Sequence, residues 1–344
     1  DNPVANFLRY KGLDFHSLSC DLKSSPKDGL QGHGHIYSMV YDSVRIDTIG
    51  FRVSQDDERV NVSALVQNNK RNPQFVFRAL LDGYLDGNKA GAAVKFFDAK
   101  DNLGVDASVK AEMLDSGICV TLAPYRQLLG YKAFNINENN FVFLARDNRV
   151  TAKVDLIADD GTGLKLYSPD EYDENMLQDL TVSLNKFDLG KLSDVIPYMP
   201  HVGGLLNGDF HVMLDKEEKL SVMSDLMVND MTYEHSPMGN IGSEIAYLQG
   251  EGVSHVVEVM LSQNGREIGA LSGTYFDEVK PRLEATIELK QTPLDLVNGF
   301  VPDQLLGLEG QAEGMLSVFG HLDRPVVNGE IYLNSSFLVS VPYG

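Results

Sequence analysis

The sequence of 344 residues predicts an all-β protein, built as a meander of antiparallel strands with a few short helices. Three observations lead to this fold class. Apolar and polar residues alternate over many short segments, turn signals recur about every dozen residues between them, and part of the chain repeats itself. No strand–helix–strand rhythm is visible, which argues against a doubly wound sheet.

The alternation is clearest at 105–113, where every odd position is apolar. Because successive side chains of a strand point to opposite sides, one face of this strand is dry and the other wet. Residues 150–156 and 283–289 follow the same pattern, which is typical of antiparallel strands with a single buried face. The side chains expected on the dry faces are Val105, Ala107, Val109, Ala111, Val150, Ala152, Val154, Leu156, Leu283, Ala285, Ile287 and Leu289.

Turn signals at 99–102, 159–163 and 264–265 separate the strands and predict hairpin connections. Residues 80–91 are a candidate for a short crossover helix. Glycines, many of them beside aspartate or asparagine, supply the positive backbone angles that tight turns need.

The segment 184–239 recurs as 289–344 with a slip of one residue. Each copy contains a short amphipathic helix that ends near a proline, expected at 188–196 and at 293–301, where Thr292 is the expected N-cap. Helices of about two turns are unstable alone. We therefore expect the first to lie on the sheet with its stripe of Leu189, Leu192 and Ile196 inward, closing an end or a gap.

These features divide the chain into four sections. A β-rich section covers 1–75, a β-meander section covers 76–180, a repeat unit with its short helix covers 181–288, and a second, truncated repeat unit covers 289–344. Since the second copy stops in the middle of the unit, we expect the chain to be a segment of a longer protein.

The chain is acidic, with 49 Asp and Glu against 29 Lys and Arg and a formal charge of −20. This balance argues against nucleic-acid binding, which needs clustered cations. No apolar run of about 18 residues predicts a membrane-spanning helix. The two cysteines, Cys20 and Cys119, lie in unrelated segments and predict neither a disulfide framework nor a zinc knuckle.

No catalytic pattern stands out. Residues 83–90 lack the spacing of a phosphate-binding loop, and 252–256 lack the final glycine of a nucleophile elbow. His33 and His35 share a strand face, but a third metal ligand is not identifiable. We therefore predict that the chain is not an enzyme and has no cofactor or metal.

The C-terminal third combines a short helix, a strand with the pattern Gly-x-x-x-Gly, a strand with the pattern Pro-Val-x-x-Gly and a closing Pro-x-Gly. The residues that form this pattern are 294–297, 301–302, 308–310, Gly314, Gly320, 325–333 and 341–344. It resembles the C-terminal domain of the TamB family, the translocation and assembly module of the Gram-negative envelope. Residues 135–140 and 147–150 are similar to the strand-rich repeats of TamB-like and AsmA-like proteins of the Bacteroidota. The resemblance is best over 181–344 and extends over 75–180.

The resemblance implies a periplasmic segment of a protein that is anchored in the inner membrane outside this chain. It also implies an elongated curved sheet, the β-taco, with an apolar trough that the twelve alternating residues would line. Relatives take part in phospholipid transport between the inner and outer membranes and in outer-membrane protein assembly. The implied partners are phospholipid acyl chains and an outer-membrane assembly protein of the barrel-insertase type. No catalytic residues carry over.

Alternation alone leaves two arrangements open. The dry faces can form an open lipid groove, or they can pack against each other as an ordinary sandwich core. A third hypothesis treats the chain as a structural or docking module that has a closed core, holds no lipid and binds an outer-membrane assembly partner through its edge strands.

Overall fold

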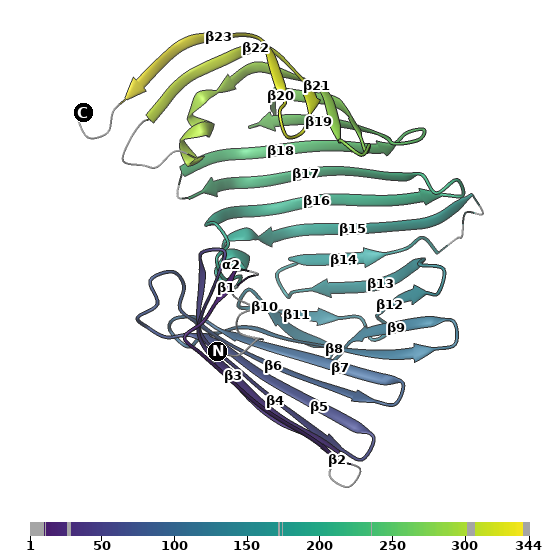
Figure 1. Cartoon of the computed structure of the whole chain (residues 1–344). Helices are drawn as coiled ribbons and strands as arrows, with labels where there is room; N and C mark the ends of the chain where they lie inside the picture. The colour runs from purple at the N-terminus through teal and green to yellow at the C-terminus, as the bar shows by residue number, and fades with distance from the viewer. Residues whose placement is uncertain are drawn as a thin grey trace. The chain divides into compact units, whose positions relative to one another are not determined.

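The computed structural model describes residues 10, 12–25, 29–170, 173, 175–234, 236–300 and 307–339. Over these residues the chain forms 23 strands of an antiparallel sheet, the short α-helix α2 (Leu189–Ser193) and the 3-10 helix η1 (Leu294–Phe300) (Figure 1). The prediction of an all-β antiparallel fold with a few short helices is confirmed.

Two compact units make up the chain. Unit 1 contains the described parts of 1–148 together with 154–159 and 191–199, and unit 2 contains 149–153, the described parts of 160–190 and those of 200–344. Strand β13 (Val150–Ile157) and helix α2 are therefore each divided between the units.

Unit 1 is mainly a meander in which each strand from β2 to β9 pairs with the next. Its strands are β1 (Leu13–Asp14), β2 (Ser17–Ser25), β3 (Gly29–Tyr41), β4 (Val44–Asp56), β5 (Arg59–Asn68), β6 (Phe77–Asp86), β7 (Lys89–Phe97), β8 (Leu103–Leu114), β9 (Gly117–Leu122), β10 (Arg126–Leu129), β11 (Lys132–Ile136) and β12 (Phe141–Ala145). Strand β12 pairs with β9, and β10 pairs with β8 and β11.

The crossover helix expected at 80–91 is wrong, because these residues form the β6–β7 hairpin. A two-residue turn joins Asp86 to Lys89, and Gly87 adopts the positive φ of 57° that this turn needs. Pairing of β6 with β7, from Arg78 opposite Phe97 to Asp86 opposite Lys89, decides the structure here over any helical pattern.

Unit 2 is also a meander, in which each strand from β14 to β23 pairs with the next. Its strands are β14 (Gly163–Tyr167), β15 (Met176–Asp188), β16 (Val202–Asp215), β17 (Leu220–Tyr233), β18 (Ser236–Gln249), β19 (Ser254–Gln263), β20 (Arg266–Phe276), β21 (Arg282–Pro293), β22 (Gly307–His321) and β23 (Val326–Val339). Figure 1 shows β15 to β18 following one another side by side.

The sequence repeat is also a repeat of backbone conformation. Lys186 and Gln291 occupy equivalent positions before the two short helices and have φ angles of 50° and 51°. Gly204 and Gly310, at the bulges that follow the helices, have φ angles of 120° and 110°. The closing residues of the second copy, 340–344, lie outside the described residues.

The two expected helices are shorter or tighter than predicted. Helix α2 covers only part of 188–196, and the second helix is the 3-10 helix η1. Thr292 does not cap it, because Thr292 belongs to β21 and its Oγ1 donates a hydrogen bond to the Ile268 carbonyl at 2.5 Å. The last residue expected in this helix, 301, lies outside the described residues.

The segment that contains α2 closes one end of the unit 1 sheet, as expected. Val195 is buried with Phe77 and Phe96, whose rings stack with centroids 5.7 Å apart. Leu192 packs against this cluster, but Ile196 is 40% exposed, so Val195 takes the inward position that the sequence assigned to Ile196. Among the described residues, no large side chain is fully buried.

Candidate functional site

One face of unit 1 is apolar across the whole of its central sheet. Residues directly opposite each other in antiparallel strands place their side chains on the same face. The register aligns Phe51, Ala64, Leu81, Val94 and Ala107 in one row from β4 to β8. The adjacent row on this face contains Val53, Val62, Gly83, Ala92, Val109 and Leu122.

This face is open over its middle and closed at one end. Val62, Leu81 and Leu85 are 45%, 42% and 59% exposed, although they are apolar and lie within the sheet. Phe77 and Phe96, beneath the α2 segment, are each only 5% exposed. A second layer packed over the face would bury the exposed group as well. The predicted residues of β8 (Val105, Ala107, Val109 and Ala111) lie on this face.

Two glycines allow the segment 191–199, which closes this end of the apolar face, to pack against the backbone of the sheet. A Cβ at Gly104 would lie 2.5 Å from Cγ1 of Val195, and one at Gly130 would lie 3.3 Å from the carbonyl oxygen of Lys191. Tyr131 packs against the cluster that contains Val195, and its hydroxyl donates to Oδ2 of Asp98 at 3.1 Å. Burial and the nearby carboxylates raise the pKa of Tyr131 to about 12.

A polar cluster holds the far end of the same segment. The Tyr198 hydroxyl donates to the Arg45 carbonyl at 2.6 Å and accepts from Nδ2 of Asn68 at 2.8 Å. Asn68 is 4% exposed, and its Oδ1 accepts from the Asp47 backbone N–H at 2.8 Å. Burial raises the pKa of Tyr198. The segment 191–199 is thus held by apolar packing at one end and by hydrogen bonds at the other.

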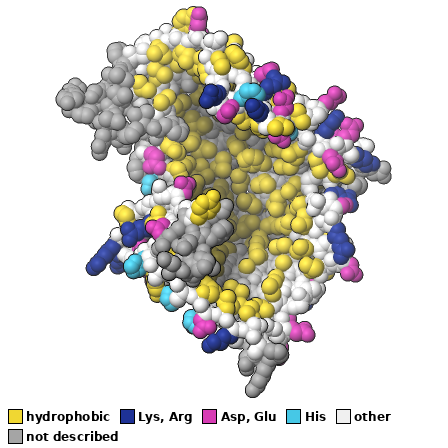
Figure 2. Space-filling model, in the orientation of Figure 1, with side chains coloured by type: hydrophobic (Ala, Val, Ile, Leu, Met, Phe, Trp, Pro, Cys, Tyr) yellow, Lys and Arg dark blue, Asp and Glu magenta, His cyan; other side chains and the backbone are white. Residues whose placement is uncertain are grey.

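Unit 2 carries a longer apolar face. One row of directly paired residues runs from β15 to β23 and consists of Val182, Phe210, Ser224, Ile245, Val259, Leu271, Ile287, Leu316 and Gly329. Leu283, Ala285 and Leu289, predicted with Ile287, lie on the same face. Figure 2 shows hydrophobic side chains gathered over the strands of unit 2, with charged side chains at the margin.

The two faces of the unit 2 sheet differ in chemistry. Phe210, Ile245, Leu271 and Ile287 are each half-buried, so the apolar face is neither sealed nor fully exposed. The opposite face carries a set of carboxylates, namely Asp209, Asp225, Glu244, Glu258, Glu284 and Glu288. Such a difference between faces is typical of a sheet with one apolar side.

Ser224 interrupts the apolar row. Its hydroxyl is buried and, alone among the buried side-chain oxygen and nitrogen atoms of the described residues, has no hydrogen-bond partner. Ser224 is not among the twelve predicted residues, although it alternates with Val222 and Leu226 in the segment 220–228 and so shares their face of the strand. A buried hydroxyl without a partner costs free energy, so Ser224 is an unfavourable position in the otherwise apolar row.

The predicted residues of β13 have a different environment. Ala152, Val154 and Leu156 are 2%, 4% and 7% exposed, whereas Val150 is half-buried. Leu156 pairs with Ile136, which is 6% exposed. Ala152, Val154 and Leu156 are therefore core residues and do not line an open face. The twelve predicted residues do not share a single environment.

A polar aromatic group lies on the apolar face of unit 2, toward one end of its strands. The Tyr247 hydroxyl lies 2.6 Å from Nδ1 of His255, and the two rings stack at 5.8 Å. Tyr275 follows at 5.6 Å from His255 and donates to Oδ1 of Asp277 at 3.3 Å. Desolvation and then Asp277 raise the pKa of Tyr275. Rings with polar tips suit a boundary between apolar material and water.

Within the described part of the chain, no three His, Cys, Asp or Glu side chains are grouped so that they could hold a metal ion. His35 lies 3.0 Å from the Ser19 hydroxyl, and His33 is paired in register with Arg52. No described helix is long and apolar enough to cross a membrane. Comparison of the chain with protein-family models, with curated proteins and with solved structures finds no match in any of the three.

Proposed function

We propose that the chain binds lipid acyl chains along the open apolar faces of its sheet. In this proposal it is a periplasmic segment of a TamB- or AsmA-like envelope protein that carries phospholipids between the inner and outer membranes. The observation that carries the proposal is the apolar row from β15 to β23, whose large side chains remain only half-buried. Exposed apolar surface of this extent is typical of binding sites for apolar molecules or other proteins.

The energetics of acyl-chain transfer favour such a surface. A chain of about 16 carbons in water costs roughly 12 kcal/mol, at about 0.8 kcal/mol for each CH₂ group. A continuous row of Leu, Ile, Val and Phe side chains removes most of this cost without any covalent chemistry. The proposal therefore assigns the chain no catalytic step, no cofactor and no nucleic-acid partner.

Small residues leave room for an acyl chain on the face. In unit 1 the row that contains Val62 and Val109 has its smallest residues at Gly83 and Ala92, between the two valines. In unit 2 Gly273 pairs with Ala285, beside the bulkier pairs of the neighbouring row. Larger side chains beside these small residues supply contact area. Together they form the shape expected of a shallow groove for a flexible chain.

The closed-core hypothesis receives less support than the open groove. Val62 and Leu81 would be buried if a second layer covered the apolar face of unit 1. The buried residues of β13 show what closed packing looks like in this chain, with Val154 at 4% exposure.

The docking hypothesis is supported by a separate observation, the edge of β23. Within the described residues β23 pairs only with β22, and Val327, Ile331 and Leu333 are 57%, 46% and 57% exposed. A long apolar edge is suited to the addition of a strand from another protein. We therefore retain, as the second candidate function, binding of an outer-membrane assembly protein of the barrel-insertase type.

A pair of neighbouring substitutions tests the lipid proposal. Ile287→Lys places a charge on the apolar face of β21, whereas Thr286→Lys places it on the opposite face beside Glu288. We expect the first variant to lose copurifying phospholipid, measured by mass spectrometry of organic extracts, and the second to keep it. Both variants are checked for folding by circular dichroism.

Equal lipid content in the two folded variants would contradict the groove. A stoichiometric protein partner and no lipid in the unaltered chain would instead favour docking through β23.

A further inference from the structure

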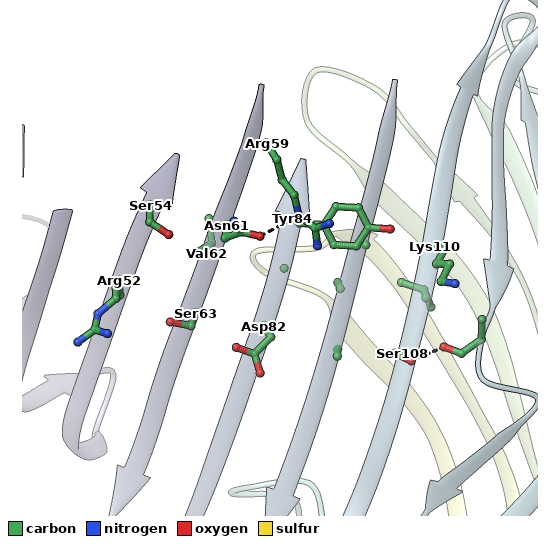
Figure 3. Close-up of a pocket in the computed structure, with 16 residues that line it drawn as sticks. Arg52, Ser54, Arg59, Asn61, Val62, Ser63, Asp82, Tyr84, Ser108 and Lys110 are labelled. Carbon is green, nitrogen blue, oxygen red and sulfur yellow. Dashed lines mark hydrogen bonds between the residues drawn. The ribbon is translucent and has the colours of Figure 1, made fainter. Parts of the chain in front are cut away.

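A second candidate site lies on the polar face of unit 1, opposite the apolar face. A hollow of about 470 Å³ extends across β4 to β8 (Figure 3). Its floor is formed by Gly91 and Ala93 of β7, which carry almost no side chain. Tyr84 of β6 and Lys110 of β8 flank Gly91 in register, and Asp82 of β6 flanks Ala93. The hollow therefore exists because β7 has small residues on this face, between two strands that carry long polar side chains.

The cations of the hollow form no ion pair within the described part of the chain. Arg52, Arg59 and Lys110 line it, and no described carboxylate lies within ion-pair distance of any of them. Asp82, the single carboxylate of the lining, likewise forms no ion pair with a described residue. Three cations and one carboxylate therefore line this hollow, in a chain whose formal charge is −20.

Arg59 is held in place before any ligand arrives. Its guanidinium carbon lies 4.2 Å from the ring centroid of Tyr84, and its Nε donates to Oδ1 of Asn61 at 3.0 Å. Figure 3 shows Arg59 lying over the Tyr84 ring. The stacking and the hydrogen bond leave the terminal guanidinium nitrogens available, and a fixed guanidinium binds an oxyanion at a lower entropic cost than a mobile one.

We propose that this hollow binds a short stretch of an acidic saccharide. Arg59 and Lys110 supply charge for a carboxylate or phosphate on the sugar, while Asn61, Ser63 and Asp82 supply hydrogen bonds for hydroxyl groups. The mixture of a few cations with neutral donors and acceptors suits a hydroxyl-rich ring that carries an anionic group.

Other classes of ligand fit the hollow less well. Strands β4 to β8 are paired on both sides, so no free edge can bind a peptide as an added strand. The Tyr84 ring lies between Arg59 and Gly91, which leaves no open ring face for a nucleobase. Val62 and Val109 belong to the opposite, apolar face, so an acyl chain gains nothing here.

Calorimetric titration of the whole chain with trigalacturonate tests the proposal, with maltotriose and inorganic phosphate as comparison probes. We expect trigalacturonate to bind, maltotriose to bind at least about tenfold more weakly, and Arg59→Ala or Lys110→Ala to weaken trigalacturonate binding about tenfold each. Lys165→Ala, a change of an exposed lysine on β14, is the matched control and should leave the affinity unchanged.

Asp82→Ala separates a saccharide site from a simple anion site. Removal of this carboxylate should weaken trigalacturonate binding, because a hydroxyl acceptor is lost, but should strengthen phosphate binding, because a repulsion is removed. The proposal is overturned if trigalacturonate does not bind at millimolar concentration. It is also overturned if Arg59→Ala and Lys110→Ala bind like the unaltered chain, or if phosphate binds as tightly as the trisaccharide.

Discussion

Val195 packs directly onto the backbone of Gly104, with its Cγ1 where a larger residue would place its own Cβ. This contact joins the segment that follows α2 to the first residues of β8. It buries Val195 to 6% exposure and covers Phe77 and Phe96 at one end of the apolar face. Closure of that end therefore depends on the absence of a side chain at one strand position.

Gly104→Ala should displace Val195 and open this end of unit 1. The added methyl group would lie 2.5 Å from Cγ1 of Val195, and overpacking of this kind costs about 1–3 kcal/mol of unfolding free energy. Denaturant unfolding measures the loss. Gly50→Ala in β4 is the control, since a Cβ there meets nothing within 4 Å and stability should not fall. Equal stabilities of the two variants would show that Val195 is not firmly seated.

Tyr131 should make the stability of the chain sensitive to alkaline pH. Burial, Asp98 and Asp194 raise the pKa of Tyr131 to about 12 from an ordinary value of 10.0, so the folded state favours the neutral phenol. The stabilisation is complete below pH 10 and is lost as the pH rises from 10 through 12. Thermal unfolding across this range should show a smaller decrease for Tyr131→Phe than for the unaltered chain. Parallel decreases would contradict the assignment.

The fold class was predictable because the alternation of β8, β13 and β21 is local and strong. The register between neighbouring strands was not predictable. That register places Ala107, Val94 and Leu81 side by side on one face. The error at 80–91 has a related cause, since a short apolar run with turn residues resembles a helix until the partner strand is known. The repeat was predictable because both copies keep the same glycines at their bulges.

The candidate site was only partly predictable. Val109 and Ile287 lie on apolar faces of the sheet, but alternation could not distinguish them from the buried Val154, because all three have the same pattern around them. Ser224 was missed, since a serine at an apolar position carries no signal until its neighbours are known to be apolar. The polar hollow depends on the small size of Gly91 and Ala93 on β7, and no sequence motif indicates it.

Two glutamate substitutions should separate open from closed parts of the apolar surface. Val154 is 4% exposed, so Val154→Glu buries a carboxylate without a partner and should prevent folding or lower the melting temperature sharply. Val109 is only half-buried, so Val109→Glu should remain folded and lose bound lipid. Melting curves and lipid extraction measure the two effects. If Val109→Glu unfolds the chain as completely as Val154→Glu, the face around β8 is a closed core.

The repeated glycines after the short helices should respond alike to substitution. Gly208 and Gly314 have φ angles of 133° and 153°, and a Cβ at either position would overlap a carbonyl oxygen of the neighbouring strand, that of Asp225 or of Glu330. Gly208→Ala and Gly314→Ala should each cost about 1–3 kcal/mol, because strain of the backbone adds to the overlap. Denaturant unfolding tests this, again against Gly50→Ala. A large loss for one variant and none for the other would mean that the two copies do not share the strand geometry that their sequences share.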